Sequence, residues 1–284
     1  MTATPEAALA ACVPAGRVRH ALWWAADYAY AAGRQVAGLL SRTSPESYTT
    51  PPVRGSAAPG SPVRAPVLLL PGVYESWRFL EPLARALHRR GHAVHVVAPF
   101  GLNRGSVPEM AELAATYLRD ADLRGAVVVA HSKGGLIGKS LLGRADVRDR
   151  LLGLVAVNTP FAGSPYARYL PLRAVRAFLP DDEVLTALAA QHADHGRIVS
   201  VATCYDPHIP GGSELPGARF VRLATPGHFR SLTDPALVPL LAAELARLAA
   251  WPPAGPATGP ATAGPPTAGP PTAGHPTAGH PTAG

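Results

Sequence analysis

Ser132 lies within the segment VVVAHSKGG (residues 127–135), which combines a β-branched run with small and polar residues. The run predicts a buried strand that ends just before the serine, and the apolar residues beyond it predict a helix. A sharp turn from strand to helix needs small residues two positions before and two after the serine, where Ala130 and Gly134 lie. Such a turn exposes the hydroxyl at the carboxyl edge of a sheet, beside the positive end of a helix dipole. Ser132 is therefore a candidate nucleophile.

The elements that must position Ser132 alternate along the chain. Helical segments separate short runs rich in Val and Leu, which predict strands at residues 67–70, 92–98, 126–130, 154–158, 198–203 and 220–224. This pattern predicts an α/β fold, with a mostly parallel sheet of about six strands and helices on both faces. Residues 161–197 interrupt the alternation, so we predict a short cap insertion over the mouth of the site.

Capping signals indicate where several of these helices begin or end. Ser106 and Glu109 have the S-x-x-E spacing of a capping box at the start of a helix. Asp234 is the expected N-cap of the last helix, with Pro235 at its first position. Gly91 is placed to end the helix that precedes the second strand.

The strand, serine and helix around Ser132 together resemble the nucleophile elbow of the α/β-hydrolases. The family pattern is G-x-S-x-G, and Ala130 replaces its first glycine, a variant of some small bacterial lipases. The segment VAVNTPFAGSPYA (155–167) is similar to the segment that follows the nucleophile helix in bacterial lipases and related esterases. The resemblance covers about residues 66–250 and implies the α/β-hydrolase fold.

The resemblance also implies the partners of Ser132, because the family's acid and histidine follow it in that order on loops after strands. The segment VSVATCYDPHIPGGS (199–213) contains a strand that leads to Asp206, and FVRLATPGHFRSL (220–232) contains one that leads to His228. His228 is then expected to take the proton of the serine hydroxyl. Asp206 is expected to orient the imidazole and stabilise its charged form.

The segment LLLPGVYESW (68–77) is similar to the oxyanion loop after the first parallel strand of the family. By this resemblance, the backbone N–H groups of Val73 and Lys133 are expected to form the oxyanion hole. Two such donors stabilise the negative charge that develops on the carbonyl oxygen during acyl transfer. This role does not depend on the side chains of Val73 and Lys133.

Other titratable residues fit a catalytic or metal-binding role less well. His131 is expected to be a packing residue whose side chain points away from the nucleophile, and His208 replaces His228 only if its loop folds unusually. The rival acids lie in the predicted insertion, not at a strand end: Asp181, Asp182 and Glu183. A predicted helix end separates the histidines that could suggest a zinc site, which are His88, His92 and His95. We therefore expect neither a metal nor an organic cofactor.

The predicted activity is hydrolysis of carboxylic esters, as an esterase or lipase that works through an acyl-enzyme. The expected substrate is a small-molecule or lipid ester. The same catalytic residues also allow a thioesterase or an acyltransferase, and less favourably a peroxidase-type activity, since a fold does not determine a substrate. A catalytically inactive binding protein with a hydrolase-like fold is the alternative outside enzymes.

Four segments divide the chain. Residues 1–44 are a predicted N-terminal extension with an amphipathic helix at 17–40, and 45–65 a linker. Residues 66–251 are the predicted hydrolase domain, and Pro, Thr, Ala and Gly repeats predict a disordered tail at 252–284. The aromatic residues of the N-terminal helix are expected either to pack on the main domain or to contact a membrane surface peripherally.

Composition limits the remaining classes of protein. The formal net charge is +7, but the basic residues are scattered and no nucleic-acid-binding motif is present, so no nucleic-acid partner is expected. No apolar run is long enough to predict a membrane-spanning helix. Together with a poor signal-peptide core, this predicts a cytoplasmic protein, at most peripheral to a membrane. Cys204 lies in an apolar run and is expected to be a buried small residue, not a disulfide partner.

Overall fold

Six parallel strands form the centre of the computed structural model, in the order β2-β1-β3-β4-β5-β6. The strands are β1 (Val67–Leu70), β2 (Val94–Val96), β3 (Ala126–His131), β4 (Leu151–Val157), β5 (Ile198–Thr203) and β6 (Arg219–Leu223). The structure describes residues 16–52, 64–169 and 172–251, so the predicted tail at 252–284 lies outside the described residues. The predicted parallel sheet is confirmed, although β2 is shorter than the predicted strand at 92–98.

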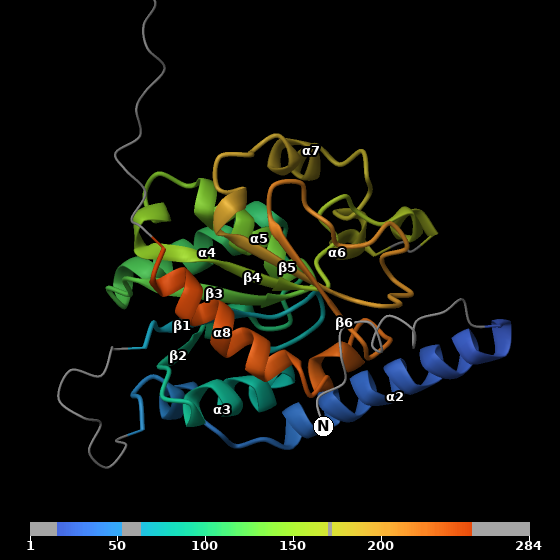
Figure 1. Cartoon of the computed structure of the whole chain (residues 1–284), viewed down its shortest axis with the longest axis horizontal. Coiled ribbons are helices and arrows are strands. Elements are labelled where there is room, and N and C mark those ends of the chain that lie inside the picture. Colours follow the sequence, from blue (N-terminus) through green and yellow to red (C-terminus); the bar gives the residue numbers. More distant parts are fainter. Residues whose placement is uncertain (1–15, 53–63, 170–171, 252–284) are drawn as a thin grey trace, which may run out of the picture. The chain divides into compact units, whose positions relative to one another are not determined.

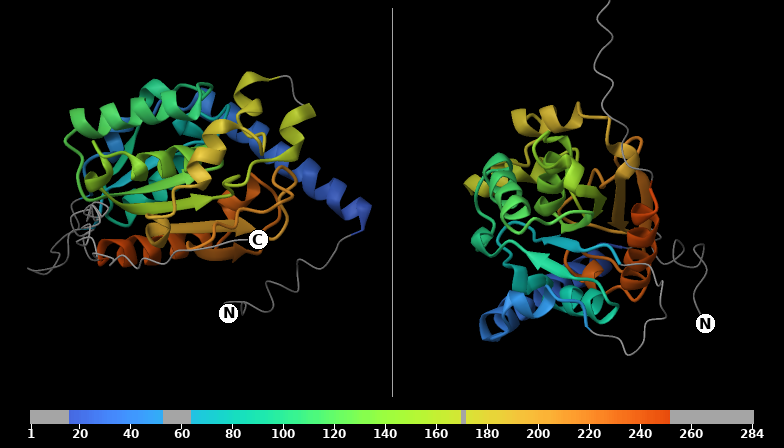
Figure 2. Two further views of the ribbon diagram at one scale, coloured as in Figure 1. Left: turned by 90° about the horizontal axis from the view of Figure 1, so that it is seen from above. Right: turned by 90° about the vertical axis from the view of Figure 1, so that its left-hand side faces the viewer.

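Helices cover both faces of this sheet (Figure 1). On one face lie α3 (Glu81–Arg89) and α8 (Leu237–Ala249), and on the other α4 (Val107–Asp120) and α5 (Lys133–Gly143). In β1, Val67 and Leu69 join the apolar cluster of α3 and α8, while Leu68 and Leu70 join that of α4 and α5. Burial on both faces explains why the strands are apolar throughout, because successive side chains point to opposite sides. Figure 2 shows these layers from two further directions.

The helix starts agree only in part with the predicted signals. At α4, Ser106 accepts a hydrogen bond from the Glu109 backbone N–H and Glu109 bonds back to Ser106, so the predicted capping box is present. The predicted start of the last helix at Asp234 is wrong, because α8 begins at Leu237. The Asp234 carboxylate instead accepts the backbone N–H groups of Thr225 and Ala236, and so ties the end of β6 to the start of α8.

Short helices occupy the interruption between β4 and β5, which the sequence predicts to be a cap insertion. They are η5 (Pro165–Tyr169), α6 (Arg173–Arg176), α7 (Glu183–Ala189) and η6 (His195–Arg197). At the N-terminal side, residues 17–40 form α2 (Arg17–Leu40), followed by η1 (Pro45–Tyr48). Helix α2 belongs to the same compact unit as the sheet and contacts η2 (Trp77–Leu80) and η7 (Arg230–Thr233).

The strand order determines where a site can form. The chain runs from β1 outward to β2 and then returns to β3 on the other side of β1. The loops after β1 and β3 therefore part in opposite directions and leave a crevice at the carboxyl edge of the sheet. Leu70 pairs with Ala130, so the loop that starts at Pro71 lies beside Ser132.

Candidate active site

Ser132 occupies a strained turn between β3 and α5. Its φ is 51° and its ψ is −121°, a conformation that residues with side chains rarely adopt. A Cβ atom at Gly134 would lie only 2.3 Å from the carbonyl oxygen of Leu70, so only glycine fits two residues after the serine. The Ser132 N–H donates to the carbonyl of Val157 at 2.8 Å, which ties the turn to the end of β4. The geometry is that of the predicted elbow.

His228 and Asp206 lie in hydrogen-bond contact, although they follow different strands. His228 Nδ1 is 2.7 Å from Asp206 Oδ2, while Asp206 Oδ1 accepts the backbone N–H groups of His208 and Ile209. Burial raises the pKa of the Asp206 carboxyl, but the charge and hydrogen bond of His228 and the contacts with His208 outweigh burial and lower that pKa. Asp206 is therefore ionised at neutral pH and can hold the His228 ring in one tautomer.

Ser132 and His228 line one pocket of about 520 Å³, together with Val73 from the predicted oxyanion loop. Apolar and aromatic side chains from α2, the segment after β4 and the His228 loop supply most of the wall. Within the described residues, the Ser132 hydroxyl makes no hydrogen bond to His228. Hydrogen bonds between catalytic groups are often long until substrate is bound, so the missing contact does not exclude either residue from a catalytic role.

The predicted oxyanion loop holds a buried carboxylate that the sequence analysis missed. Glu75 is 2% exposed, and its Oε2 accepts the Gly72 N–H at 2.7 Å. In the described part of the chain, no protein acceptor takes the neighbouring N–H of Val73. Lys133 is the first residue of α5, where an N–H has no acceptor within its own helix. The two predicted oxyanion donors are thus free to bind a substrate oxygen.

The Lys133 side chain is fixed more firmly than the sequence indicates. It is fully buried, and its ammonium donates to the carbonyl of Asn103 at 2.9 Å and to that of Gly105. Burial lowers the pKa of Lys133 to about 8. These contacts tie the first turn of α5 to the loop after η3 (Ala98–Phe100).

His131 does more than pack, so that part of the prediction is wrong. Its Nδ1 lies 2.9 and 3.0 Å from the two carboxylate oxygens of Glu75, and its Nε2 lies 3.0 Å from the carbonyl oxygen of His228. The His228 carbonyl and an ionised Glu75 are both acceptors, so with Glu75 ionised both ring nitrogens donate and the ring is an imidazolium. Burial lowers the pKa of His131, but Glu75, the His228 carbonyl and Asp206 outweigh burial and raise it. A buried ion pair therefore links the oxyanion loop to the His228 loop.

Replacing Glu75 with glutamine is expected to lower the free energy of unfolding by about 3–5 kcal/mol below pH 6, because it leaves the His131 charge buried without a partner. Since the folded-state pKa of His131 is raised, the pair stabilises the protein fully below the unfolded-state pKa of about 6.5. That contribution is lost as the pH rises through the folded-state pKa. The difference between wild type and Glu75→Gln in urea unfolding should therefore shrink at alkaline pH.

Glu244→Gln is the matched control for this experiment. Glu244 is also a buried carboxylate, but its partners are Arg219 and Arg247, at 2.7 and 2.6 Å. Arginine stays charged throughout this pH range, so the Glu244→Gln difference should not change with pH. If the difference in free energy of unfolding between wild type and Glu75→Gln also did not change with pH, it would contradict an ion pair between Glu75 and His131.

Asn158 is a second residue that sequence reasoning missed. It is fully buried at the end of β4, and its side-chain amide donates to the His228 carbonyl and to the Ser231 hydroxyl, both at 2.8 Å. Its side-chain oxygen accepts the Thr203 N–H at 3.0 Å. Its position in the segment similar to bacterial lipases was visible in the sequence, but its link to the His228 loop was not.

His208, the rival histidine, lies beside the candidate triad and has a different partner. Its ring centre is 4.8 Å from that of His228, and its Nε2 is 2.8 Å from the Tyr28 hydroxyl of α2. Burial lowers the pKa of His208 to about 3, so the ring is neutral at neutral pH. Of the rival acids, Asp182 accepts the backbone N–H groups of Val184 and Leu185 at the start of α7.

Asp206, His208 and His228 also form a cluster whose potential ligand atoms lie within 4.8 Å of one another. Zinc needs each ligand nitrogen at about 2.0–2.1 Å, and it would compete with Asp206 for His228 Nδ1. The present contact of 2.7 Å is a hydrogen-bond distance. The geometry thus matches an oriented imidazole better than a metal site.

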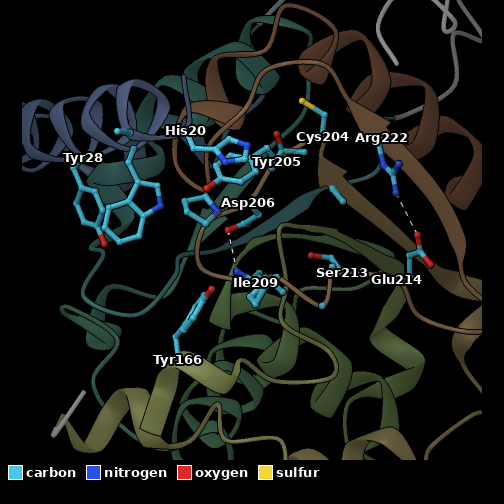
Figure 3. A pocket seen from close by; sticks show the side chains of 18 of the residues that line it. His20, Tyr28, Tyr166, Cys204, Tyr205, Asp206, Ile209, Ser213, Glu214 and Arg222 are labelled. Atoms are coloured by element: carbon cyan, nitrogen blue, oxygen red, sulfur yellow. Dashed lines mark hydrogen bonds and ion pairs between the residues drawn. The ribbon is translucent and has the colours of Figure 1, made fainter. Parts of the chain in front are cut away.

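A second cleft, of about 1040 Å³, is lined by residues of α2 and of the loop that contains Asp206, and it shares Tyr28 and Tyr166 with the first pocket (Figure 3). Its lining includes Tyr205 and Arg222, but Ser132 and His228 are not part of it. Cys204 lies in the wall and is disulfide-bonded, so the expectation of a buried free cysteine is wrong. The other cysteine, Cys12, lies outside the described residues.

Comparisons with known proteins were made at the levels of sequence and fold. No protein-family model matches the sequence, and no curated protein matches it. The fold is similar to the mature lipase BlEst2 of Bacillus licheniformis, with a TM-score of 0.54 and 16% identity, over 68% of this chain and 96% of that chain. It is also similar to a structure of the metagenome-derived lipolytic enzymes LipS and LipT, with a TM-score of 0.50 and 15% identity, over 65% and 93% of the two chains.

The sheet, the helices on its two faces and these similarities define the fold. The chain has the α/β-hydrolase fold, which confirms the resemblance seen in the sequence.

Proposed function

We propose that the protein is a serine hydrolase that cleaves carboxylic esters through an acyl-enzyme. The single observation that carries this proposal is the strained Ser132 turn, which opens into the same pocket as His228 while Asp206 holds that ring at 2.7 Å. An ordinary turn serine has no need of a strained backbone beside a carboxylate-bound histidine. Strain of this kind concentrates at functional sites.

In the proposed reaction, His228 Nε2 removes the proton of the Ser132 hydroxyl as its oxygen attacks the ester carbonyl. The carbonyl oxygen becomes an oxyanion, which the N–H groups of Val73 and Lys133 stabilise. His228 then gives the proton to the leaving alcohol as the ester bond breaks. Water, activated by the same histidine, releases the acyl group and restores the serine. Asp206 stabilises the charged imidazole in both halves of the reaction.

The pocket favours lipophilic esters within this class. Its wall includes apolar side chains that carry no hydrogen-bonding group, among them Val175, Phe178 and Ile209. Burial of an acyl chain against such a wall contributes about 0.8 kcal/mol per CH₂ group. Thioester hydrolysis and acyl transfer use the same groups and remain the alternatives among enzymes, and an inactive binding protein is the alternative outside them.

Labelling with a fluorophosphonate probe tests the proposed nucleophile. We expect the purified wild type to react covalently at Ser132 and to cleave nitrophenyl esters at rates that rise with acyl length up to a medium chain. Activity should persist in EDTA, because no step uses a metal. A folded wild type that reacts with neither the probe nor any ester or thioester would instead favour a binding protein.

We further propose that α2 contacts membranes peripherally. Between residues 20 and 40, every exposed residue of this helix is apolar, aromatic or glycine. Its polar residues point inward instead: Asp27, Arg34 and Gln35 all bond to the rest of the protein. An outward face of this kind, such as that formed by Leu22 and Leu39, suits burial at a lipid interface.

Charge favours an anionic bilayer over a second copy of the chain as the occupant of this face. Exposed arginines flank the face at both ends, with Arg17 and Arg19 at the start of α2 and Arg42 just beyond it. Each basic residue near an anionic membrane contributes about 1 kcal/mol, whereas two copies with a net charge of +7 repel each other. Trp24 and Tyr28 join this face to the pocket. Among the described residues, no helix is long and apolar enough to cross the bilayer.

The double substitution Leu22→Glu and Leu39→Glu should weaken binding to phosphatidylglycerol vesicles by about 100-fold or more, because each buried leucine contributes about 1.5–3 kcal/mol. Co-sedimentation measures the bound fraction, with phosphatidylcholine vesicles as the neutral reference. Leu113→Glu, on α4, adds the same charge to another exposed leucine and should bind as wild type does. If the wild type does not bind vesicles and instead dimerises through α2, the partner of this face is a second copy of the chain and not a membrane.

The disulfide at Cys204 bears on where the protein works. Disulfides persist in oxidising compartments, while cytosolic thiols are kept reduced. We therefore propose an oxidising compartment in place of the cytoplasmic location expected from the sequence. Thiol alkylation of protein isolated without reductant checks this: Cys204 should remain unmodified, and its full modification would restore the cytoplasmic prediction.

A further inference from the structure

Helix α2 holds both loops that flank Ser132, although it precedes the segment that resembles the α/β-hydrolases. Toward one loop it directs Asp27, which is fully buried and bonds to the backbone at His228. Toward the other it directs Gln35, whose amide donates to the carbonyl of Tyr74 at 2.7 Å, within the predicted oxyanion loop. The helix therefore braces the site on two sides.

Asp27 binds three consecutive backbone N–H groups. Its Oδ2 accepts from His228 at 2.9 Å, and its Oδ1 accepts from Phe229 at 2.9 Å and from Arg230 at 2.8 Å. These groups lie at the start of η7, where successive N–H groups converge and bind an anion well. Hydrogen bonds to an ionised acceptor are stronger than those between neutral groups. The carboxylate thus fixes the backbone that carries the His228 ring.

Gly227, the residue before His228, leaves the space that the Asp27 carboxylate occupies. Its φ of +115° is a conformation that other residues rarely adopt, and an added Cβ would lie 2.4 Å from Asp27 Oδ1. The close approach of the carboxylate therefore requires glycine at the residue before His228. The residue types at positions 27 and 227 therefore depend on each other, although the two positions are distant in the sequence.

The peptide groups on both sides of His228 are held. Asp27 takes its N–H, while its carbonyl accepts from Asn158 at 2.8 Å and from His131 at 3.0 Å. The side chain of His228 is held in turn by Asp206, whose Oδ2 lies 2.7 Å from Nδ1 of the ring. Of these four partners, Asp27 alone comes from outside the segment that resembles the hydrolases.

We propose that Asp27 is a positioning residue for the catalytic base, and that α2 is a working part of the active site. The kinetic part of this inference rests on the proposed ester hydrolysis. Its structural part, that Asp27 holds the backbone at residues 228–230, does not. Asp27 touches no reacting atom and acts through the position of the His228 ring.

Asp27→Asn is the primary variant, because it keeps the shape of the side chain but places an amide donor against backbone donors. The kcat for a soluble ester is expected to fall by about 10- to 100-fold, since misplacement of a catalytic group by about 1 Å costs up to about 10²-fold. The KM should change less than about twofold, because the pocket wall is intact. Gly227→Ala should lower kcat in the same way, and the double variant should lose less than the product of the single losses.

A control separates positioning from general loss of stability. Glu244→Gln removes a buried carboxylate from α8 and leaves its partners Arg219 and Arg247 unpaired, so it should lower the melting temperature. Because Arg219 begins β6, this site lies at the edge of the sheet opposite the active site. Its kcat should stay within about twofold of wild type at a temperature where all variants are folded.

Amide hydrogen exchange tests the structural part independently of any activity. In Asp27→Asn, the amides of residues 228–230 should exchange at least about tenfold faster, while those of β3 and β4 keep their protection. Unchanged exchange at these amides, or a kcat equal to that of wild type, would overturn the inference. If the wild type cleaves no ester but the amides of residues 228–230 still exchange faster in Asp27→Asn, the structural part of the inference stands. Only the proposed function is then rejected.

Discussion

Replacing Ser132 with alanine is expected to lower kcat for ester hydrolysis by about 10⁴- to 10⁶-fold and to abolish labelling by a fluorophosphonate. In the proposed mechanism the hydroxyl oxygen of Ser132 forms the acyl-enzyme, and loss of a serine nucleophile has effects of that size. Ser132 lies in the strained elbow at the start of α5 and lines the apolar pocket with His228. Measurement of kcat and KM with one nitrophenyl ester, beside probe labelling, checks the result.

The residual rate of Ser132→Ala is itself informative. Since the proposed oxyanion donors are the backbone N–H groups of Val73 and Lys133, the substitution leaves them in place. A small residual activity, with KM close to that of wild type, is therefore expected. Ser164 is a suitable control: its hydroxyl lines the same pocket but donates to the His208 carbonyl at 2.6 Å. Probe labelling that survives in Ser132→Ala would show that another residue is the nucleophile.

Replacing Asp206 with asparagine has the second-largest expected effect, a fall in kcat of about 10⁴-fold. The asparagine oxygen can keep the bonds from the His208 and Ile209 N–H groups, which orients its amide toward His228 Nδ1. An amide donor there stabilises the tautomer with the proton on Nε2, which cannot accept the proton of Ser132. Steady-state kinetics should show kcat reduced and KM nearly unchanged, because Asp206 is not part of the pocket wall.

Asp182→Asn is the matched control, because Asp182 is a rival acid by sequence and also accepts two backbone N–H groups. Asparagine caps helices about as well as aspartate, so this variant should retain kcat within about twofold. If Asp182→Asn lost activity while Asp206→Asn kept it, the acid assigned here would be the wrong one.

Local patterns predicted the parts of the site that depend on neighbours along the chain. The β-branched run before Ser132 and the small residues around it predicted a strand, a turn and a helix, and the structure has them as β3, the elbow and α5. The capping box at Ser106 was predictable for the same reason, since both of its residues lie within one helical turn. The start of α8 was not, because Asp234 bonds to Thr225 of a preceding loop.

Asp27 and Glu75 show what local patterns miss. In the sequence, Asp27 only interrupts an apolar helix, and Glu75 is only one residue of a segment that resembles an oxyanion loop. In the structure, Asp27 binds a backbone N–H 201 positions away, and Glu75 binds a histidine 56 positions away. One feature of the sequence could have pointed to Asp27. It is the one acidic residue between 17 and 40, in a helix that is otherwise mostly apolar.

The sequence by itself therefore determined the alternation of strands and helices and the tight turn at Ser132, and through resemblance it suggested the proposed order of serine, acid and histidine. These features follow from steric and hydrophobic preferences that act over a few residues. Only the tertiary structure decided that α2 contacts the backbone at His228, that His131 lies against Glu75 and that Cys204 forms a disulfide. Those outcomes depend on which surfaces meet when the sheet and helices pack, and no local period in the sequence records a partner that is distant along the chain.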